Sequence, residues 1–299
     1  MTLRGTWYIL PTPFDADGQL DTGSLSRLVE AAAAWGVDGL TAMGVMGEPG
    51  ALTADERERA LRAIADAARG KLPFAVGCSA VGPALVRELV EQARGLGAVA
   101  AMVAAPTLLR NADLLPGFYR TASTFGLPLI IQDEPAATGV LMPLSTLVAS
   151  IDASGAEVVK LEEPPTPPKI TRLLAQRPDV HVFGGLGGVS ALHELQRGAC
   201  GTMTGFAYPE ILRAVRVALE AGDADAAARC FDRYLPLIQF EGQPVVGLAI
   251  RKEVLRRRGT LASGRTRGLV PLIDAPTSAE LDDLLRRLEI APGLAPFTP

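Results

Sequence analysis

Short apolar runs alternate with longer amphipathic runs along most of this chain. Each short run is bounded by glycine, proline or a charged residue, and its length of about five residues is typical of a buried strand. We therefore expect eight strands, over residues 7–11, 39–44, 73–77, 99–104, 128–132, 157–161, 180–184 and 201–205.

The segments between these runs are rich in alanine, leucine and arginine at helical spacing. The clearest of them are 24–35, 54–68 and 83–96. Thr53 is followed three residues later by Glu56, the pattern of a capping box at the start of a helix. A glycine stands where each helix should end, at Gly36, Gly70 and Gly97.

Strands that alternate with helices are parallel, and eight of them favour a closed barrel over an open sheet. No glycine-rich phosphate motif follows the first strand, which argues against a dinucleotide-binding fold. After residue 208 the pattern is entirely helical, over 210–220, 224–238, 245–258 and 278–288. We predict a (β/α)8 TIM barrel over residues 1–222 and a C-terminal helical extension over 223–299 that packs on the barrel.

Composition narrows the functional classes. The net charge of −4 and a pI near 5.4 argue against nucleic acid as a partner. Residues 1–20 contain charges and no long apolar run, and no stretch is long enough to span a membrane. Three cysteines, Cys78, Cys200 and Cys230, suit a reduced compartment, so we expect a cytoplasmic protein. With two histidines and no zinc-like spacing, we expect no metal site.

Lysine is rare, since only four of the 29 basic residues are lysines. Lys160 closes the apolar run 157–161, and the carboxyl ends of parallel barrel strands are where active sites form. The other three lysines precede a strand or fall in or beside helices. A desolvated lysine can lose its proton and attack a carbonyl, which an arginine cannot do. Two interpretations stay open, a strand-end lysine that reaches solvent and a catalytic nucleophile.

Several motifs, in order along the chain, carry a family resemblance. They are Pro11-Thr12-Pro13-Phe14 with Asp21, Gly44-Val45-Met46-Gly47-Glu48, Leu52-Thr53 with Glu56-Arg57, and Pro135-Ala136-Ala137-Thr138-Gly139. With these motifs the chain resembles, over nearly its whole length, the dihydrodipicolinate synthase and N-acetylneuraminate lyase superfamily. These are aldolase-type barrels that condense or cleave 2-keto acids through a lysine Schiff base. The resemblance implies that Lys160 is that lysine.

The chain also departs from the family pattern. Gln132 stands where the family has a proton-relaying tyrosine, and Pro106-Thr107-Leu108 replaces Pro-Tyr-Tyr. Val45-Met46 replaces the Thr-Thr pair of the pyruvate-carboxylate loop, and Ala137 stands where the synthase has a substrate-binding arginine. We therefore do not expect dihydrodipicolinate synthesis itself.

Strand alternation suggests what moves protons in place of the tyrosines. If Lys160 points into the barrel, Glu162 does too, and Gln132 and Glu134 share the inward face of the neighbouring strand. We expect Glu162, with Glu134, to act as acid and base, and Gln132 to orient the substrate. The alternative is that Glu162 and Glu163 form a solvated acidic turn.

Substrate binding is expected at several further positions. Backbone N–H groups of the loop that contains Val45, Met46 and Gly47 can bind a carboxylate without the lost hydroxyl groups. Glu134 and Met203, the latter in the eighth strand, complete the predicted substrate-binding set. The glycine-rich turn at 184–188 should leave room above the barrel for a bulky or phosphate-bearing substrate. Glu48 should support the loop from behind.

These residues predict a lyase that forms a Schiff base with pyruvate or another 2-keto acid and needs no cofactor. Two alternatives stay open, a keto-acid-binding barrel without turnover and a hydratase or dehydratase that acts on a larger 2-keto acid. The family resemblance implies a homodimer or homotetramer, and the loop pair Leu108-Leu109 is a candidate subunit contact.

Overall fold

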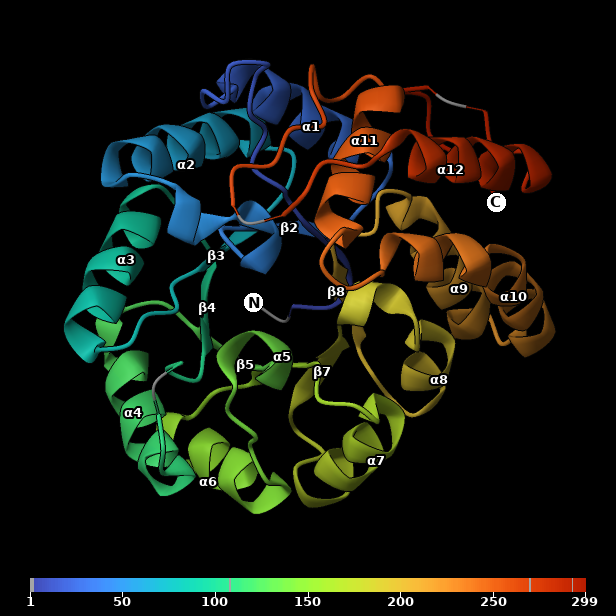
Figure 1. Cartoon of the computed structure of the whole chain (residues 1–299). Helices are drawn as coiled ribbons and strands as arrows, with labels where there is room; N and C mark the ends of the chain where they lie inside the picture. Colours follow the sequence, from blue (N-terminus) through green and yellow to red (C-terminus); the bar gives the residue numbers. More distant parts are fainter. Residues whose placement is uncertain (1–2, 108, 269, 292) are drawn as a thin grey trace.

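The computed structural model describes residues 3–107, 109–268, 270–291 and 293–299. Eight parallel strands form one closed barrel in sequence order (Figure 1). The strands are β1 Gly5–Ile9, β2 Gly39–Ala42, β3 Phe74–Gly77, β4 Ala100–Ala104, β5 Leu129–Asp133, β6 Val158–Leu161, β7 His181–Gly184 and β8 Gly201–Thr204.

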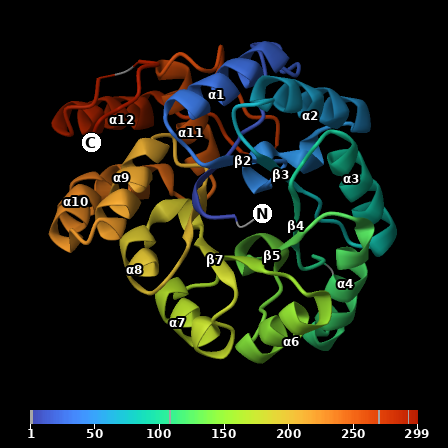
Figure 2. The ribbon, with the colours of Figure 1, turned by 180° about the vertical axis from the view of Figure 1, so that it is seen from behind.

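A ring of helices surrounds the barrel, as the opposite views in Figures 1 and 2 show. The helices of the ring are α1 Thr22–Ala34, α2 Ala54–Ala68, α3 Pro83–Gly95, α4 Leu115–Ala122, α6 Leu144–Ser154, α7 Thr166–Gln176, α8 Ala191–Gln196 and α9 Pro209–Glu220. Short helical turns on the loops are η1 Val45–Gly47, η2 Pro49–Ala51, η3 Ala112–Leu114, η4 Ser123–Phe125, α5 Pro135–Thr138 and η5 Leu186–Gly188. The predicted TIM barrel is confirmed.

Local sequence signals place the ends of these helices as predicted. The Thr53 hydroxyl accepts the N–H of Glu56 at 3.2 Å, and the Glu56 carboxylate accepts the N–H of Thr53 at 3.0 Å, which completes the capping box of α2. Gly36, Gly70 and Gly97 have φ values of 75°, 70° and 86°, the left-handed conformation in which helices commonly end.

The first strand differs from its prediction, since β1 starts at Gly5 rather than residue 7. Gly5 pairs with Gly201 of β8, and this pairing closes the barrel. A Cβ on Gly201 would lie 1.9 Å from the Gly5 carbonyl oxygen, so the two strands can approach only where one lacks a side chain. Glycines carry no hydrophobic signal, which is why the apolar pattern missed this start.

The inside of the barrel below the strand ends is filled by apolar side chains. Trp7, Met102, Ile130, Phe183 and Met203 are fully or almost fully buried in one inner cluster. The Trp7 and Phe183 rings pack edge to face, with centroids 6.3 Å apart. This packing makes the barrel a solid core with a floor, so any ligand must bind above it.

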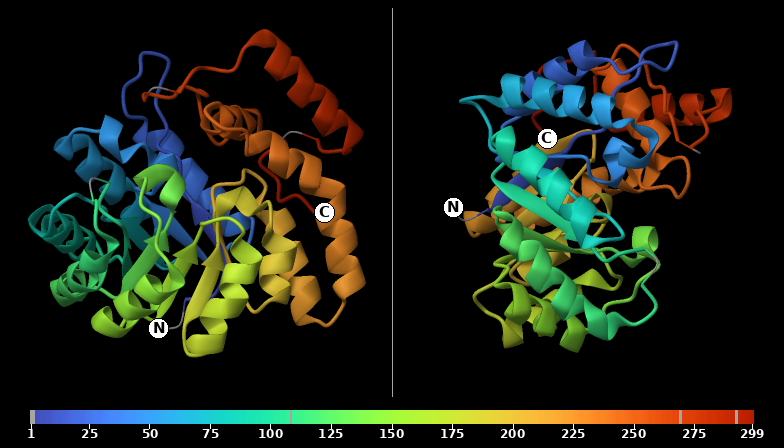
Figure 3. Two further views of the ribbon diagram at one scale, coloured as in Figure 1. Left: turned by 60° about the horizontal axis from the view of Figure 1, so that its bottom comes forward. Right: turned by 90° about the vertical axis from the view of Figure 1, so that its left-hand side faces the viewer.

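Three helices follow the barrel, α10 Ala224–Glu241, α11 Gly247–Arg257 and α12 Ala275–Arg287. The side view on the left of Figure 3 places the N-terminus at the foot of the barrel and α12 at the opposite end. The predicted helical extension is confirmed, and its boundary at residue 222 stays a prediction. Within the described residues, no helix is long and apolar enough to cross a membrane.

Candidate active site

The predicted lysine lies inside the barrel at the carboxyl end of β6. Lys160 pairs in register with Gln132 of β5, so the two side chains share the inward face. The Lys160 residue is only 3% exposed, so it does not reach solvent as the simpler interpretation of a strand-end lysine required. A buried amine at this position has the setting that a nucleophilic lysine needs.

Glu162 is the centre of the polar contacts at the mouth. One carboxylate oxygen, Oε2, lies 2.7 Å from Lys160 Nζ and accepts a hydrogen bond from Gln132 Nε2 at 2.9 Å. Its other oxygen accepts the Leu186 N–H at 3.2 Å. Because Glu162 is only 7% exposed, the alternative of a solvated acidic turn is wrong for this residue.

Glu134 joins the same cluster through Gln132, whose Nε2 also donates to Glu134 Oε2 at 3.1 Å. The pKa of Glu134 is raised to about 7, mainly by burial and also by the negative charge of Glu162, while the charge of Lys160 acts in the opposite direction. Near neutral pH a large fraction of Glu134 is therefore protonated. The mouth thus holds an acid and a carboxylate next to one amine, an arrangement suited to proton transfer.

The glycine-rich turn after β7 does not leave the empty space that the sequence suggested. A Cβ on Gly185 would lie 2.3 Å from the Glu162 side chain, and one on Gly187 would lie 2.7 Å from Arg251 Nη2. The absent side chains instead let these two charged groups approach the backbone. The predicted space for a bulky substrate is therefore partly taken by Glu162 and Arg251.

The loop after β2 forms the short turn η1. Its later N–H groups are used internally, since Gly47 donates to Gly44 at 2.8 Å and Glu48 donates to Val45 at 3.1 Å. The first N–H groups of a helical turn have no partner within the turn, so those of Val45 and Met46 are the ones a carboxylate would use. Val45 is 56% exposed, whereas Gly47 is buried and its carbonyl accepts the Thr12 hydroxyl at 2.6 Å.

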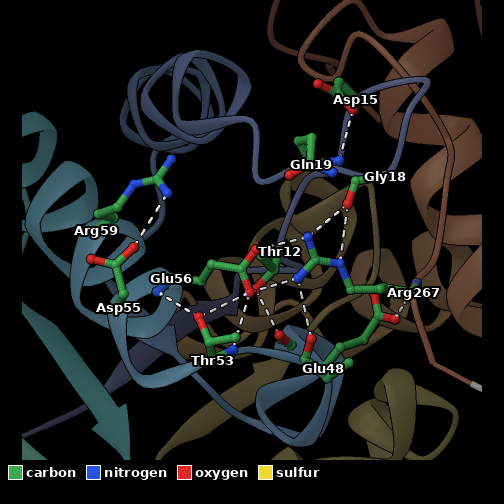
Figure 4. A network of polar contacts seen from close by, with 12 residues as sticks. Thr12, Asp15, Gly18, Gln19, Glu48, Thr53, Asp55, Glu56, Arg59 and Arg267 are labelled. Carbon is green, nitrogen blue, oxygen red and sulfur yellow. Dashed lines mark hydrogen bonds and ion pairs between the residues drawn. The ribbon is translucent and has the colours of Figure 1, made fainter.

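Glu48 supports this loop from behind, as expected. Its carboxylate accepts the N–H groups of Arg267 at 2.7 Å and Gly268 at 2.9 Å, and it forms an ion pair with the buried Lys252 of α11. Figure 4 shows Glu48 beside Arg267, whose guanidinium in turn pairs with Glu56 at 2.7 Å. The C-terminal extension is thereby tied to the loop that forms one wall of the mouth.

A cavity of about 340 Å³ opens beside the cluster on the side of β2 to β5. Its lining includes Gly44, Val45, Gln132, Glu134 and Arg57, so it joins the loop to two members of the cluster. A second cavity of about 520 Å³ lies at the foot of the barrel, among strand starts, and contains no predicted site residue. We regard the smaller cavity as the candidate substrate entrance, because Gln132 and Glu134 of the polar cluster lie in its lining.

The remaining predicted positions do not all lie at the mouth. Met46 is partly buried, and its side chain contacts Arg251, with Nη1 to Sδ at 2.9 Å. Met203 is fully buried in the floor of the barrel. Leu108 lies outside the described residues, and Leu109 is half-buried against the core rather than exposed as expected.

Sequence reasoning missed a second buried lysine. Lys169 of α7 donates to Asp133 at 2.6 Å, to the Met142 carbonyl at 2.8 Å and to Glu163. These three acceptors match the three N–H donors of an ammonium group. Burial raises the pKa of Asp133 to about 6, and the charge of Lys169 lowers it.

The scarcity of lysine in the sequence was the one signal that could have pointed to the buried Lys169. Lys160, Lys169 and Lys252 are all buried and ion-paired, and Lys71 is the one with an exposed side chain. Among the residues that the structure describes, no group of three or more His, Cys, Asp or Glu side chains could hold a metal ion.

Known proteins share both the sequence and the fold of this chain. The profile of the dihydrodipicolinate synthetase family matches residues 2–280. An L-2-keto-3-deoxyarabonate dehydratase from Azospirillum brasilense is 29% identical over 294 residues, which are 96% of this chain and 94% of that protein. A 4-hydroxy-tetrahydrodipicolinate synthase from Xanthomonas axonopodis pv. citri is 32% identical over 279 residues, covering 91% and 90% of the two chains. The crystal structure of a dihydrodipicolinate synthase from Rhodopseudomonas palustris matches with a TM-score of 0.91 at 34% identity, covering 95% and 97%.

Proposed function

This chain belongs to the dihydrodipicolinate synthetase family and is a lyase, and we propose that it dehydrates a 2-keto-3-deoxy sugar acid through a Schiff base on Lys160. The observation that carries the proposal is the buried cluster in which Glu162 contacts both Lys160 Nζ and Gln132, with Glu134 beside them. This cluster supplies the proton transfer that tyrosines supply elsewhere in the family.

In the first step the neutral Lys160 amine attacks C2 of the keto acid. Glu162 lies 2.7 Å from Nζ, close enough to take the proton that the ammonium must lose. The same proton then leaves with the carbinolamine hydroxyl as water, and an iminium forms between Nζ and C2. A carboxylate next to this cation stabilises it electrostatically.

Dehydration follows from the iminium without any oxidant or reductant. Removal of a C3 proton by Glu162 gives the enamine, whose electron pair then expels the C4 hydroxyl. That hydroxyl leaves as water with a proton from Glu134, whose pKa is raised to about 7 by burial. The ionised Glu134 then takes a proton from C5 while Glu162 returns one to C3, and the resulting enol tautomerises to an aldehyde at C5 as its hydroxyl proton moves to C4. Hydrolysis of the iminium by water then releases the product and regenerates the Lys160 amine. The net change is the loss of one water.

Four observations favour dehydration over the synthase reaction. The acid and base at the mouth are carboxyl groups, and Gln132 replaces the tyrosine of the synthases at the register position next to Lys160. Ala137 lies exposed on α5, where the synthase has its arginine. The dehydratase from Azospirillum brasilense aligns along 96% of this chain, which supports a keto-deoxy sugar acid as the substrate class.

Product analysis tests the proposal. Incubated with L-2-keto-3-deoxyarabonate, the protein should yield a keto acid that is lighter by one water and should release no pyruvate. Stoichiometric release of pyruvate and a two-carbon aldehyde would instead identify an aldolase. Formation of a Schiff-base adduct without any product would identify a binding protein that lacks turnover.

We infer further that the enzyme acts in the cytoplasm as a homodimer or homotetramer. Cys78, Cys200 and Cys230 are free thiols, which suits a reducing compartment. Val81 beside the substrate entrance and Leu141 are 56% and 66% exposed, and such side chains are commonly covered by a second subunit. Light scattering coupled to size-exclusion chromatography should give two or four times the mass of 31.3 kDa, and a monomer would refute this inference.

A further inference from the structure

Arg251 of α11 brings a positive charge from the C-terminal extension to the mouth of the barrel. Its side chain is only 11% exposed. One terminal nitrogen, Nη1, contacts Met46 Sδ at 2.9 Å, and the other, Nη2, lies against Gly187. Burial lowers the pKa of the Arg251 guanidinium, and the negative charges of Glu241 and, more weakly, Glu162 offset only part of this lowering. Arg251 therefore belongs to the site, on the side of β7 and β8.

The hydrogen-bond donors of Arg251 are poorly used. A guanidinium has five N–H donors, and a thioether sulfur is a weak acceptor for one of them. Among the described residues, the buried Nε has no hydrogen-bond partner, and the ion pair from Nε to Glu241 is long at 3.7 Å. A buried charge with unsatisfied donors is destabilising unless a partner completes it, so the arrangement fits a group that waits for a ligand.

Arg258 of the same extension shows what a structural arginine looks like here. It donates to Glu210 with both terminal nitrogens, at 3.2 and 2.6 Å, and to the Ala207 carbonyl at 2.6 Å. Its guanidinium also packs on the rings of Trp35 and Tyr208, at 3.9 and 4.3 Å from their centroids. Both arginines leave Nε without a hydrogen-bond partner among the described residues. The difference lies in the terminal nitrogens, which in Arg258 donate three hydrogen bonds to oxygen atoms, whereas in the described part of the chain those of Arg251 donate only to the Met46 sulfur.

Glu241 holds Arg251 from behind without neutralising it fully. Its side chain is completely buried, with Oε2 bound to the Ala207 N–H at 3.0 Å and Oε1 without a hydrogen-bond partner among the described residues. Burial raises the pKa of Glu241 to about 7, and the charge of Arg251 lowers it. Near neutral pH the carboxyl is therefore only partly ionised, and part of the Arg251 charge stays available.

The position of Arg251 suits it to contact the tail of the substrate, by which we mean the carbons beyond C3 and their oxygen atoms. With C2 on Lys160 and the C1 carboxylate on the N–H groups of Val45 and Met46, the carbons beyond C3 are left to meet another wall of the mouth. Arg251 touches the outer end of the Met46 side chain rather than the loop backbone, and its other nitrogen faces Gly187. A tail oxygen could take the place of the thioether as its acceptor.

We propose that Arg251 is a substrate-binding residue that donates hydrogen bonds to oxygen atoms on C4 and C5 of the substrate, and so selects 2-keto acids with an oxygen-bearing tail. This assignment rests on the proposed Schiff-base function for its direction along the substrate. The oxygen atoms can belong to hydroxyl groups or to a second carboxylate, since a guanidinium donates to both.

Three five-carbon 2-keto acids separate these cases. L-2-Keto-3-deoxyarabonate carries hydroxyl groups on C4 and C5, 2-oxoglutarate carries a carboxylate at C5, and 2-oxopentanoate carries no tail oxygen. Their affinities are measured by calorimetry on the Lys160→Ala variant, in which no Schiff base can form. The half-saturating concentration for borohydride trapping, with Lys160 intact, is the second readout.

The variants are Arg251→Leu and, as a matched control, Arg256→Leu. Arg256 lies on the same helix, but its side chain is 46% exposed and pairs with Glu253 away from the mouth. We expect Arg251→Leu to weaken binding of at least one oxygen-bearing acid tenfold or more and to change binding of 2-oxopentanoate by less than twofold. The acid that loses more affinity identifies the tail as hydroxyl or carboxylate. Arg256→Leu should leave all three affinities unchanged.

Two results would overturn the assignment. An equal loss for 2-oxopentanoate would mean that Arg251 binds the C1 carboxylate or only maintains the fold, and no loss for either oxygen-bearing acid would mean that it binds no tail. Failure of the Schiff-base proposal is distinguishable, because trapping would then fail in the wild type while the calorimetric difference between the ligands persisted.

Discussion

The C-terminal helices support the mouth of the barrel through the buried ion pair between Glu48 and Lys252, and substitutions in this pair test that support most directly. In a Glu48→Leu variant, the partners that remain for Lys252 Nζ among the described residues would be the Arg265 carbonyl at 3.0 Å and the face of the Phe14 ring at 4.5 Å. The Lys252 side chain has no exposed surface, and burial already lowers its pKa. The variant also removes the acceptor for two backbone N–H groups in the segment 267–268.

These contacts set the free energy of unfolding that Glu48→Leu should lose. Removal of one partner of a buried ion pair costs about 3–5 kcal/mol, because the other charge stays buried without compensation. For a chain of 299 residues, an unfolding entropy of roughly 2.1 cal/mol/K per residue converts this loss to a fall in Tm of about 5–8 °C. The Glu48→Leu/Lys252→Met double variant removes both charges, so it should recover about 1–3 kcal/mol relative to the sum of the single variants.

The wild type, the Glu48→Leu and Lys252→Met single variants and the double variant form a double-mutant cycle. Urea unfolding of these four proteins, followed by circular dichroism and by the fluorescence of Trp7 and Trp35, measures it. A Glu48→Leu variant within about 1 kcal/mol of the wild type would contradict the argument, because it would mean that Lys252 needs no counterion. Strict additivity of the single changes would contradict it equally, because the two side chains would then act independently.

Three further predictions concern the buried carboxyl groups. Glu162→Gln should lower kcat by about 10²–10⁴-fold in steady-state assays. Glu163 pairs with Lys169 rather than with Lys160, so Glu163→Gln should retain most activity, and equal losses would refute the assignment of Glu162. If Glu134 is the acid, kcat should fall as the pH rises through about 7, and this limb should disappear in Glu134→Gln. Burial also raises the pKa of Glu194 from 4.5 to about 7, so its folded-state stabilisation is complete below pH 4.5 and is lost as the pH rises to 7. Glu194→Gln should remove up to roughly 3 kcal/mol of that decline in chemical unfolding, and an unchanged pH profile would contradict the assignment.

The polar cluster could be predicted from sequence because its geometry is local. Side chains on a strand alternate with a period of two, so an inward Lys160 requires an inward Glu162, and register with β5 brings Gln132 beside them. Neither step needs knowledge of distant packing. The contacts of Glu162 at 2.7 and 2.9 Å are the observed consequence.

Arg251 could not be predicted in this way. It reaches the mouth from α11, far along the chain from Lys160, and the approach depends on how the C-terminal helices pack on the barrel. The approach of Arg251 needs a glycine at position 187, but glycine occurs in turns for several other reasons, so Gly187 does not by itself predict a nearby arginine. The ion pairs of Lys169 and Lys252 are long-range in the same sense, and only the scarcity of lysine hinted at them.

The central claim is that Lys160 forms a Schiff base with a 2-keto acid. Incubation of the protein with pyruvate and sodium borohydride, followed by proteolysis and mass spectrometry, tests it most directly. We predict a single reduced adduct on the peptide that contains Lys160 and none in the Lys160→Ala variant. An adduct on Lys71, Lys169 or Lys252 instead, or no adduct with pyruvate or L-2-keto-3-deoxyarabonate, would contradict the account.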